Sequence, residues 1–300
     1  MHVHANDAVH VPVLVEEVVT FIARNPDGIY VDGTLGAGGH TARILSNLSP
    51  AGRVIGIDVD EQIIDIARRH CAAYQDRFII LKGNFSEMKN LLASIQVSQV
   101  DGILLDLGVS SYQLDSIERG FSFRGDARLD MRMDRSSTLT ADLILNTYDS
   151  SQLERLFFEY GEERHSKPIV RKIMRERQTG RIESTLQLKN IIEAAVGKRF
   201  VTKTLARIFQ ALRIEVNNEM VVLRSVLRDS SDLLRRAGRI AVISYHSLED
   251  RIVKHAFRDM SHGAEPLMRI ITGKPVEASS EEMLRNPRSR SAKLRVAERV

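Results

Sequence analysis

Short hydrophobic runs alternate with helical patterns along the first third of the chain. Runs rich in β-branched and aliphatic residues occur at Ile29–Asp32, Val54–Asp58, Phe78–Leu81 and Ile103–Leu107. The segments between them, such as the one from Glu61 to Ala73, repeat their apolar residues at the 3.6-residue period of a helix. Strands that alternate with helices predict a parallel, doubly wound α/β sheet.

The middle third has helix signals and no strand signals. Thr140 precedes a helical stretch, Ser151 with Glu154 matches a capping box, and a further helix is expected between Ser184 or Thr185 and Gly197. We therefore predict an all-helical insert.

Strand patterns return at 239–245, 268–272 and 294–297, which brings the total to seven. A long helix from about 215 to about 236 is expected before them, and a long loop over 273–292 between the last two. The predicted organisation is a catalytic domain of residues 1–111 and 213–300, interrupted by a helical insert at 112–212.

Composition narrows the class of protein. With 300 residues, 27% charged and 43% hydrophobic, the chain is typical of an ordered globular protein. The single Cys71 excludes an internal disulfide, and no Cys/His cluster has zinc-ligand spacing. The apolar runs are too short for a membrane helix, and the N-terminus does not resemble a secretory signal. We expect a cytoplasmic protein with no membrane partner.

Positive charge is concentrated in the predicted insert. Arg164–Arg213 holds 13 Lys or Arg against three Glu, a net charge of +10, which leaves −6 for the remaining residues. A second basic run lies within 285–299. Two such runs favour a polyanion such as RNA, with Arg171, Lys172 and Arg175 as candidate contacts, although solvated helix faces are the alternative.

The turn after the first predicted strand contains four glycines, at positions 33, 36, 38 and 39. Glycines at a strand-to-helix turn let a ligand approach the backbone, and the free N–H groups at the helix start attract an anionic group. Asp58 ends the next strand about 20 residues later, where a carboxylate can accept hydrogen bonds from ribose hydroxyls. This favours a cofactor that carries a nucleoside.

The spacing distinguishes between two such cofactors. A dinucleotide motif needs a third glycine where Thr41 stands, so S-adenosylmethionine is favoured. Phe85 after the third strand is placed to cover an adenine, or else belongs to the core. Asp106 ends the fourth strand at the ligand-binding edge, or else caps the next helix.

Several long motifs resemble one known family. They are Asp106–Asp115 (DLGVSSYQLD), Glu118–Phe123 (ERGFSF), Leu129–Asp134 (LDMRMD), Ser244–Arg251 (SYHSLEDR) and Asn286–Arg295 (NPRSRSAKLR), with further blocks at 10–14, 33–40 and 203–219. Together they are similar to the bacterial 16S rRNA cytosine-N4 methyltransferase family (RsmH, also called MraW). Tyr112, where the family pattern has Pro, and the stretch 124–127 depart from it.

The resemblance implies a class I methyltransferase fold with a helical insert, S-adenosylmethionine as cofactor and a decoding-centre cytosine of 16S rRNA in the small ribosomal subunit as acceptor. It places cofactor contacts at Gly38, Gly39, His40, Asp58, Phe85, Asp106 and Gln113.

The inventory of reactive residues agrees with methylation of an exocyclic amine. C5 methylation of a pyrimidine usually needs a Cys nucleophile, and Cys71 lies far from the fourth strand. Ribose methylation commonly uses a lysine, and none follows the fourth or fifth strand. Acceptors such as Asp106 can hold the amino hydrogens and favour the charge that develops on nitrogen, so Asp106 is the catalytic candidate.

Tyr245, His246 and Tyr112 are candidates for the substrate pocket, although a lone His is as often structural. His2, His4 and His10 lack companion ligands, so no metal is assigned. A nicotinamide oxidoreductase and a non-catalytic RNA-binding assembly factor are the alternatives, and a homodimer is left open.

Overall fold

The protein, a computed structural model in which residues 12–300 are described, divides into two compact units. The described residues up to Gly108 and Val221–Val300 form one, the sheet unit, and Val109–Met220 form the other, the helical unit. The N-terminal histidines His2, His4 and His10 lie outside the described residues.

The sheet unit is built on seven strands. They are β1 (Ile29–Asp32), β2 (Arg53–Asp58), β3 (Phe78–Lys82), β4 (Val100–Asp106), β5 (Leu234–Ser244), β6 (Met268–Ile270) and β7 (Lys293–Arg299). Their order is β3-β2-β1-β4-β5-β7-β6. Strand β7 alone runs in the opposite direction to the other six. This confirms the predicted α/β class, a Rossmann-like sheet. The order reverses between β1 and β4, and folds of this kind bind ligands outside the carboxyl ends of the strands at that point.

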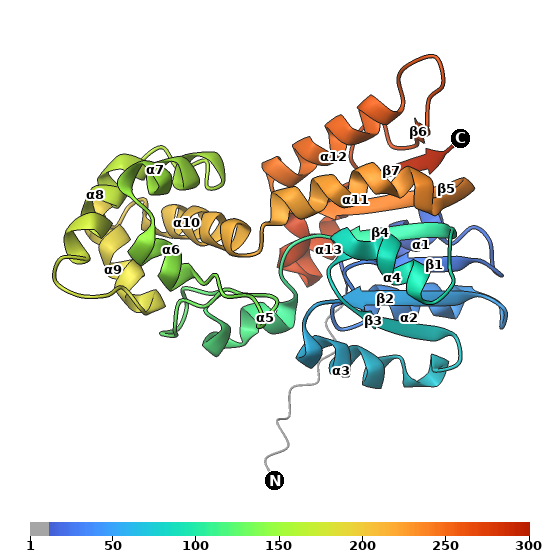
Figure 1. Ribbon diagram of the computed structural model, residues 1–300, viewed down its shortest axis with the longest axis horizontal. Coiled ribbons are helices and arrows are strands. Elements are labelled where there is room, and N and C mark those ends of the chain that lie inside the picture. The colour runs from blue at the N-terminus through green and yellow to red at the C-terminus, as the bar shows by residue number, and fades with distance from the viewer. Residues whose placement is uncertain (1–11) are drawn as a thin grey trace, which may run out of the picture. The chain divides into compact units, whose positions relative to one another are not determined.

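Helices cover both faces of the sheet (Figure 1). They are α1 (Val15–Ile22), α2 (Gly39–Asn47), α3 (Glu61–His70), α4 (Met88–Ser94), α11 (Glu219–Leu233) and α12 (Ser247–Met260). The short helix α13 (Ser280–Arg285) precedes β7 and has no buried residue. Helices α1, α2 and α3 share one buried cluster with the strands, to which they contribute Val18, Ile44 and Ala67. The apolar face of each helix is thus held against the sheet by burial of hydrophobic surface.

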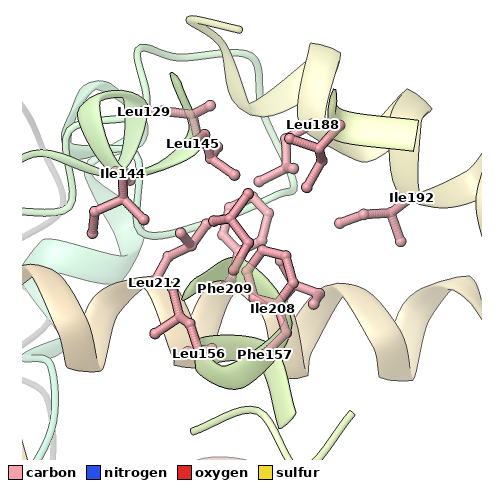
Figure 2. Packing of buried hydrophobic residues seen from close by; sticks show 14 of the residues in the cluster. Leu129, Ile144, Leu145, Leu156, Phe157, Leu188, Ile192, Ile208, Phe209 and Leu212 are labelled. Carbon is pink, nitrogen blue, oxygen red and sulfur yellow. The ribbon is translucent and has the colours of Figure 1, made fainter. Parts of the chain in front are cut away.

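The helical unit contains α5 (Ser111–Asp115), α6 (Ala141–Thr147), α7 (Ser150–Glu159), α8 (Ser166–Glu176), α9 (Thr185–Val196) and α10 (Val201–Val216). Its core is a separate cluster in which Phe157, Ile208 and Leu212 are buried (Figure 2). Thr140 and Ser184 cap α6 and α9 as predicted, because each side chain accepts a hydrogen bond from an N–H of the first turn. A core of its own makes this unit a folded body rather than a long loop.

The boundaries of the insert differ from the prediction. The structure places them at 108/109 and 220/221 instead of 111/112 and 212/213. The helix predicted from about 215 to about 236 is confirmed as α11 but is shorter, because α10 continues to Val216 and β5 begins at Leu234. The Asn217 side chain binds the backbone of Met131 and Met133, and Asn218 has a φ of 51°, so the chain turns between the two helices.

Two local predictions were also wrong. Helix α7 is capped by Asp149 with Gln152 rather than by Ser151 with Glu154, because a capping box accepts Asp at its first position and Gln at its last. The predicted loop at 273–292 contains α13 and a 3₁₀ helix at Pro287–Ser291. In the described part of the chain, no helix combines the length and the apolar character needed to cross a membrane.

Two adjacent phenylalanines test the core of the helical unit. Phe157 is fully buried, whereas 62% of Phe158 is exposed. We expect Phe157→Ala to lower the free energy of unfolding by about 3–5 kcal/mol through the cavity it leaves. Phe158→Ala should change it by no more than about 0.5 kcal/mol. Urea unfolding of both variants measures the difference, and equal effects would contradict this packing.

Candidate active site

The glycine-rich turn is anchored by Asp32, the last residue of β1. Asp32 is 1% exposed, accepts a 2.7 Å hydrogen bond from Thr41 Oγ1 on α2 and a 3.3 Å bond from the Thr34 amide. Thr34 Oγ1 in turn accepts a 2.6 Å bond from the Asp106 amide at the end of β4. One buried carboxylate therefore connects β1, α2 and, through Thr34, β4.

The glycines of the turn have different roles. Gly38 has a φ of 80°, and a Cβ there would lie 3.1 Å from Cys71 Sγ; a Cβ on Gly39 would lie 3.2 Å from the Pro12 ring. Both positions need glycine for close packing within the unit. Gly36 has a φ of 51°, and its missing Cβ faces nothing closer than 3.8 Å. Open space beside the backbone, which a ligand requires, is therefore found at Gly36.

Asp58 lies beside this turn at the end of β2. Its Oδ2 accepts the Gly36 amide at 3.0 Å, and its Oδ1 accepts the Asp60 amide at the same distance. Burial raises the pKa of Asp58 to about 6, against these two stabilising hydrogen bonds. Each carboxylate oxygen keeps a second acceptor site for a ligand hydroxyl.

Asp106 ends β4, next to the point where the strand order reverses. Its Oδ1 accepts a 2.8 Å hydrogen bond from the Oη atom of Tyr245, the residue that follows β5. Burial raises the pKa of Asp106 to about 7, although the bond from Tyr245 opposes the shift. Burial and the charge of Asp106 raise the pKa of Tyr245 well above 10, so the phenol keeps its proton and remains the donor.

His40 borders Asp106 from the first turn of α2. Its Nε2 lies 2.9 Å from the Val13 carbonyl, which can only accept, so Nε2 carries the hydrogen. Burial lowers the pKa of His40 below 6.5, although the charge of Asp32 opposes the shift. In the neutral ring Nδ1 is an acceptor, 3.7 Å from Asp106 Oδ2. Two acceptors that face each other favour a proton on Asp106, in the same direction as its raised pKa.

His246 has a structural role. It is the N-cap of α12, where Nδ1 accepts the Glu249 amide at 3.4 Å. Its Nε2 lies 3.2 Å from Glu249 Oε1, although the geometry is not that of a hydrogen bond. Glu249 Oε2 also accepts the Tyr245 amide at 2.8 Å, so the cap of α12 positions Tyr245.

The remaining predicted site residues fall in two places. Phe85, half-buried, opens the 3₁₀ helix after β3 in the sheet unit. Tyr112 and Gln113 belong to the helical unit, where 37% of Tyr112 is exposed and the Gln113 side chain accepts the Ser110 amide in a capping box.

Two further groups singled out from the sequence are the Cys71 thiol and the basic residues of α8. Burial raises the pKa of the Cys71 thiol to about 12, so it is a packing residue next to α3 and not a nucleophile. On α8, Arg171 and Arg175 are exposed and Lys172 is half-buried.

Known proteins resemble this chain along nearly its whole length. The model of the MraW methylase family matches residues 7–300. The ribosomal RNA small subunit methyltransferase H of Desulfotalea psychrophila is 45% identical over 297 residues, which are 98% of this chain and 99% of that protein. The protein of the same name from Geobacter sulfurreducens is 46% identical over 307 residues, 97% of this chain and 99% of that protein.

The chain belongs to the MraW methylase family. The resemblance stated from the sequence motifs is thereby confirmed, and with it a class I fold, methyltransferase activity and S-adenosylmethionine as the cofactor. This decides against the nicotinamide oxidoreductase and against the non-catalytic assembly factor. A solved structure, TrmN from Thermus thermophilus, is more distant, with 13% identity and a TM-score of 0.46 over 96% of this chain and 48% of that one.

The residues of this MraW methylase fit the cofactor. Asp58 has free acceptor sites for ribose hydroxyls, and Gly36 leaves the backbone beside it open. Neither Asp58 nor Asp106 forms an ion pair with Lys or Arg in the part of the chain that the structure describes, so both suit a ligand with positive charge. Helix α2 begins without a side-chain cap, which leaves N–H groups for the cofactor carboxylate.

Asp32, Thr34 and Thr41 belong to this site but were not predicted from the sequence. The available signal was an acid directly before the first glycine of the turn, with hydroxyl residues two and nine positions later. Because Asp32 is buried and its oxygens bind Thr34 and Thr41, its role is to position the turn.

The first prediction for this MraW methylase concerns Asp58. We expect Asp58→Ala to weaken S-adenosylmethionine binding by roughly 1.5–3 kcal/mol, because ligand hydroxyls lose a buried acceptor. Asp65→Ala, which removes an exposed carboxylate on the following helix, is the matched control and should leave affinity unchanged. Calorimetry on both variants gives the answer, and an unaltered affinity for Asp58→Ala would remove Asp58 from the site.

The second prediction concerns pH. Since the pKa of Asp106 is about 7, its ionised fraction rises as the pH increases through neutrality. We expect affinity for S-adenosylmethionine to rise by roughly tenfold from about pH 6 to about pH 8, and less for S-adenosylhomocysteine, which lacks the sulfonium charge. Asp106→Asn should remove this difference. The same pH dependence in Asp106→Asn would assign the titration to another group.

Proposed function

We propose that this chain transfers the methyl group of S-adenosylmethionine to the exocyclic N4 of a cytosine in 16S rRNA of the small ribosomal subunit. The relatives that match its full length are named for methylation of small-subunit ribosomal RNA. The observation that carries the choice of atom is the Asp106–Tyr245 pair, a carboxylate and a phenol joined by a 2.8 Å hydrogen bond at the carboxyl edge of the sheet.

The pair suits an amine that must become a nucleophile. The N4 lone pair of cytosine is delocalised into the ring, so acceptors that hold the amino hydrogens restore its reactivity. Asp106 supplies an acceptor oxygen, and its pKa of about 7 allows it to take up the proton that N4 must lose after methylation. Bound S-adenosylmethionine supplies the electrophilic methyl group on its sulfonium.

Tyr245 holds Asp106 in place through its phenol. Its backbone is fixed by Glu249, whose other oxygen lies near His246, so the cap of α12 determines where the phenol stands. In this proposal Asp106 is the catalytic residue, Tyr245 lines the cytosine pocket, and His246 is a positioning residue. Gly38, Gly39, His40 and Phe85 remain the proposed surroundings of the cofactor.

In this proposal the basic helical unit binds the rRNA. Tyr112 and Gln113 lie at the start of that unit in the sequence. The protein is assigned to the cytoplasm, where ribosomal subunits mature. Methylation assays with assembled subunits and with naked 16S rRNA would show which is the substrate, and light scattering would give the oligomeric state.

The decisive experiment compares 16S rRNA from cells with and without this protein. Mass spectrometry of nucleosides should show N4-methylcytidine only when the protein is present. Expression of the Asp106→Asn variant should leave the modification absent while the protein accumulates normally. N4-methylcytidine at an unchanged level without the protein would overturn the proposal.

Substitutions that remove charge from α8 test whether this helix binds rRNA. Arg171, Lys172 and Arg175 on α8 form no ion pair in the described part of the chain. Changing all three to Gln should weaken RNA binding and flatten its log–log salt dependence by about one unit for each phosphate that is no longer neutralised. Affinity for S-adenosylmethionine, measured on the same preparation, should not change.

The matched control removes three exposed charges from the sheet unit, at Arg53, Arg69 and Arg236. This variant should keep the wild-type salt dependence. If both triple variants behave alike, the basic face of α8 is a solvated surface and makes no specific RNA contact.

A further inference from the structure

An exposed aromatic ring stands on the surface of the helical unit at Phe200. Half of this side chain is exposed, and it is the residue that precedes α10. The ring is stacked with His165, with the ring centroids 6.2 Å apart and the planes at 27°. The Arg199 guanidinium lies 5.5 Å from the Phe200 centroid. We refer to Phe200, His165 and Arg199 as the Phe200 platform.

The buried carboxylate of Glu163 binds His165, one of the three residues of the platform. Glu163 is fully buried, and its Oε1 accepts the His165 amide at 2.8 Å and lies 3.0 Å from His165 Nδ1. Its Oε2 accepts a bond from Arg207 at 3.4 Å. Burial opposes ionisation of Glu163, but the bonds from His165, Arg207 and Thr204 outweigh it and keep the pKa below its usual value. The imidazole is therefore fixed in orientation, with Nδ1 as the donor to Glu163.

The surroundings of the platform are basic. The two segments that build it, 162–167 and 198–207, contain six Lys or Arg and two acidic residues, the exposed Glu162 and the buried Glu163. Lys203 follows Phe200 by three residues, so both lie on the same side of the first turn of α10. Lys198, Arg199 and Lys203 are exposed.

A single exposed phenylalanine is by itself unremarkable on a protein surface. Phe158 on α7 is such a case, because 62% of it is exposed and it has no stacked ring or guanidinium among the described residues. Phe200 differs because its neighbour is fixed by a carboxylate in the core. Glu163 is paired with Arg207 as well as with His165, so it stays charged in the core and holds the imidazole in one orientation against the Phe200 ring.

We propose that the Phe200 platform stacks an unpaired base of the RNA substrate, with Arg199 and Lys203 on the adjacent phosphates. Unpaired bases are recognised by stacking on aromatic rings and guanidinium planes next to cations that track the backbone. A protein partner is less suited, since one ring surrounded by positive charge offers little apolar area. The inference rests on the proposed function, because it assumes an RNA substrate.

The absence of Trp from the sequence allows a direct test. Phe200→Trp places the only indole of the protein in the platform, and Phe158→Trp places it elsewhere on the same unit. Titration with single-stranded RNA, either a 12-nucleotide oligouridine or a 16S rRNA fragment, should quench the fluorescence of the first variant and leave the second unchanged. Equal responses in both variants would show that no base stacks on this ring.

A second measurement compares affinities. Phe200→Ala should weaken binding of the 16S rRNA fragment by roughly 5- to 150-fold, the range expected for loss of one stacked base. Phe200→Tyr should restore it, and Phe158→Ala should match the wild type. Circular dichroism and S-adenosylmethionine affinity, unchanged in all three, confirm that each variant is folded.

The outcomes separate the inference from the proposed function. If the wild type methylates 16S rRNA while Phe200→Ala binds RNA as tightly as wild type, the inference is wrong and the proposed function stands. If the wild type methylates no rRNA, the proposed function fails, and the fluorescence titration with oligouridine still decides whether the platform binds bases.

Discussion

The sheet unit depends on one buried carboxylate. Asp32 at the end of β1 is nearly inaccessible, and burial raises its pKa, so the group is costly unless its oxygens are occupied. They accept hydrogen bonds from the Thr41 hydroxyl and the Thr34 amide. The Thr34 hydroxyl oxygen in turn accepts a bond from the Asp106 amide on β4. The side chains of Asp32 and Thr34 thus fix the glycine turn against β4, together with the backbone bond from the Gly33 amide to the Leu104 carbonyl. Apolar packing alone would define the relative positions of these elements less precisely, because it has no preferred direction.

This constraint places three acidic side chains at one edge of a sheet without a cationic partner from Lys or Arg in the described residues. Asp58 and Asp106 have raised pKa values of about 6 and about 7, and in both cases burial is the main cause. A site of this kind binds a positively charged ligand more tightly when its acids ionise, and it stores part of the folding free energy as unfavourable burial. Strongly perturbed pKa values are typical of functional sites, and here their main cause is the burial of the carboxyl groups at the strand ends.

The sheet was predictable because each strand has its own apolar pattern, and the glycine turn, Asp58 and Asp106 follow directly at strand ends. Asp32 was missed because its function is to hold other residues, which a motif search for ligand contacts does not detect. The break at Asn218 depends on its left-handed φ, for which Asn is a weak sequence signal, and on the tertiary bonds of Asn217, which the sequence does not show. The capping role of His246 was equally hidden, since a His after a strand gives no indication of which side chain its nitrogens will meet.

Positive charge is concentrated in the second, separately packed unit. The carboxylates that suit a cationic cofactor repel phosphates, and the proposed function therefore assigns RNA binding to residues elsewhere in the chain. The segment Arg164–Arg213 carries a net charge of +10, whereas all other residues together carry −6. Six cations in the two segments around Phe200 would repel one another in a small unit, and the fully buried Glu163 offsets part of that repulsion while it orients His165. The helical unit has a hydrophobic core of its own, so it can fold around this charge without apolar contacts from the sheet.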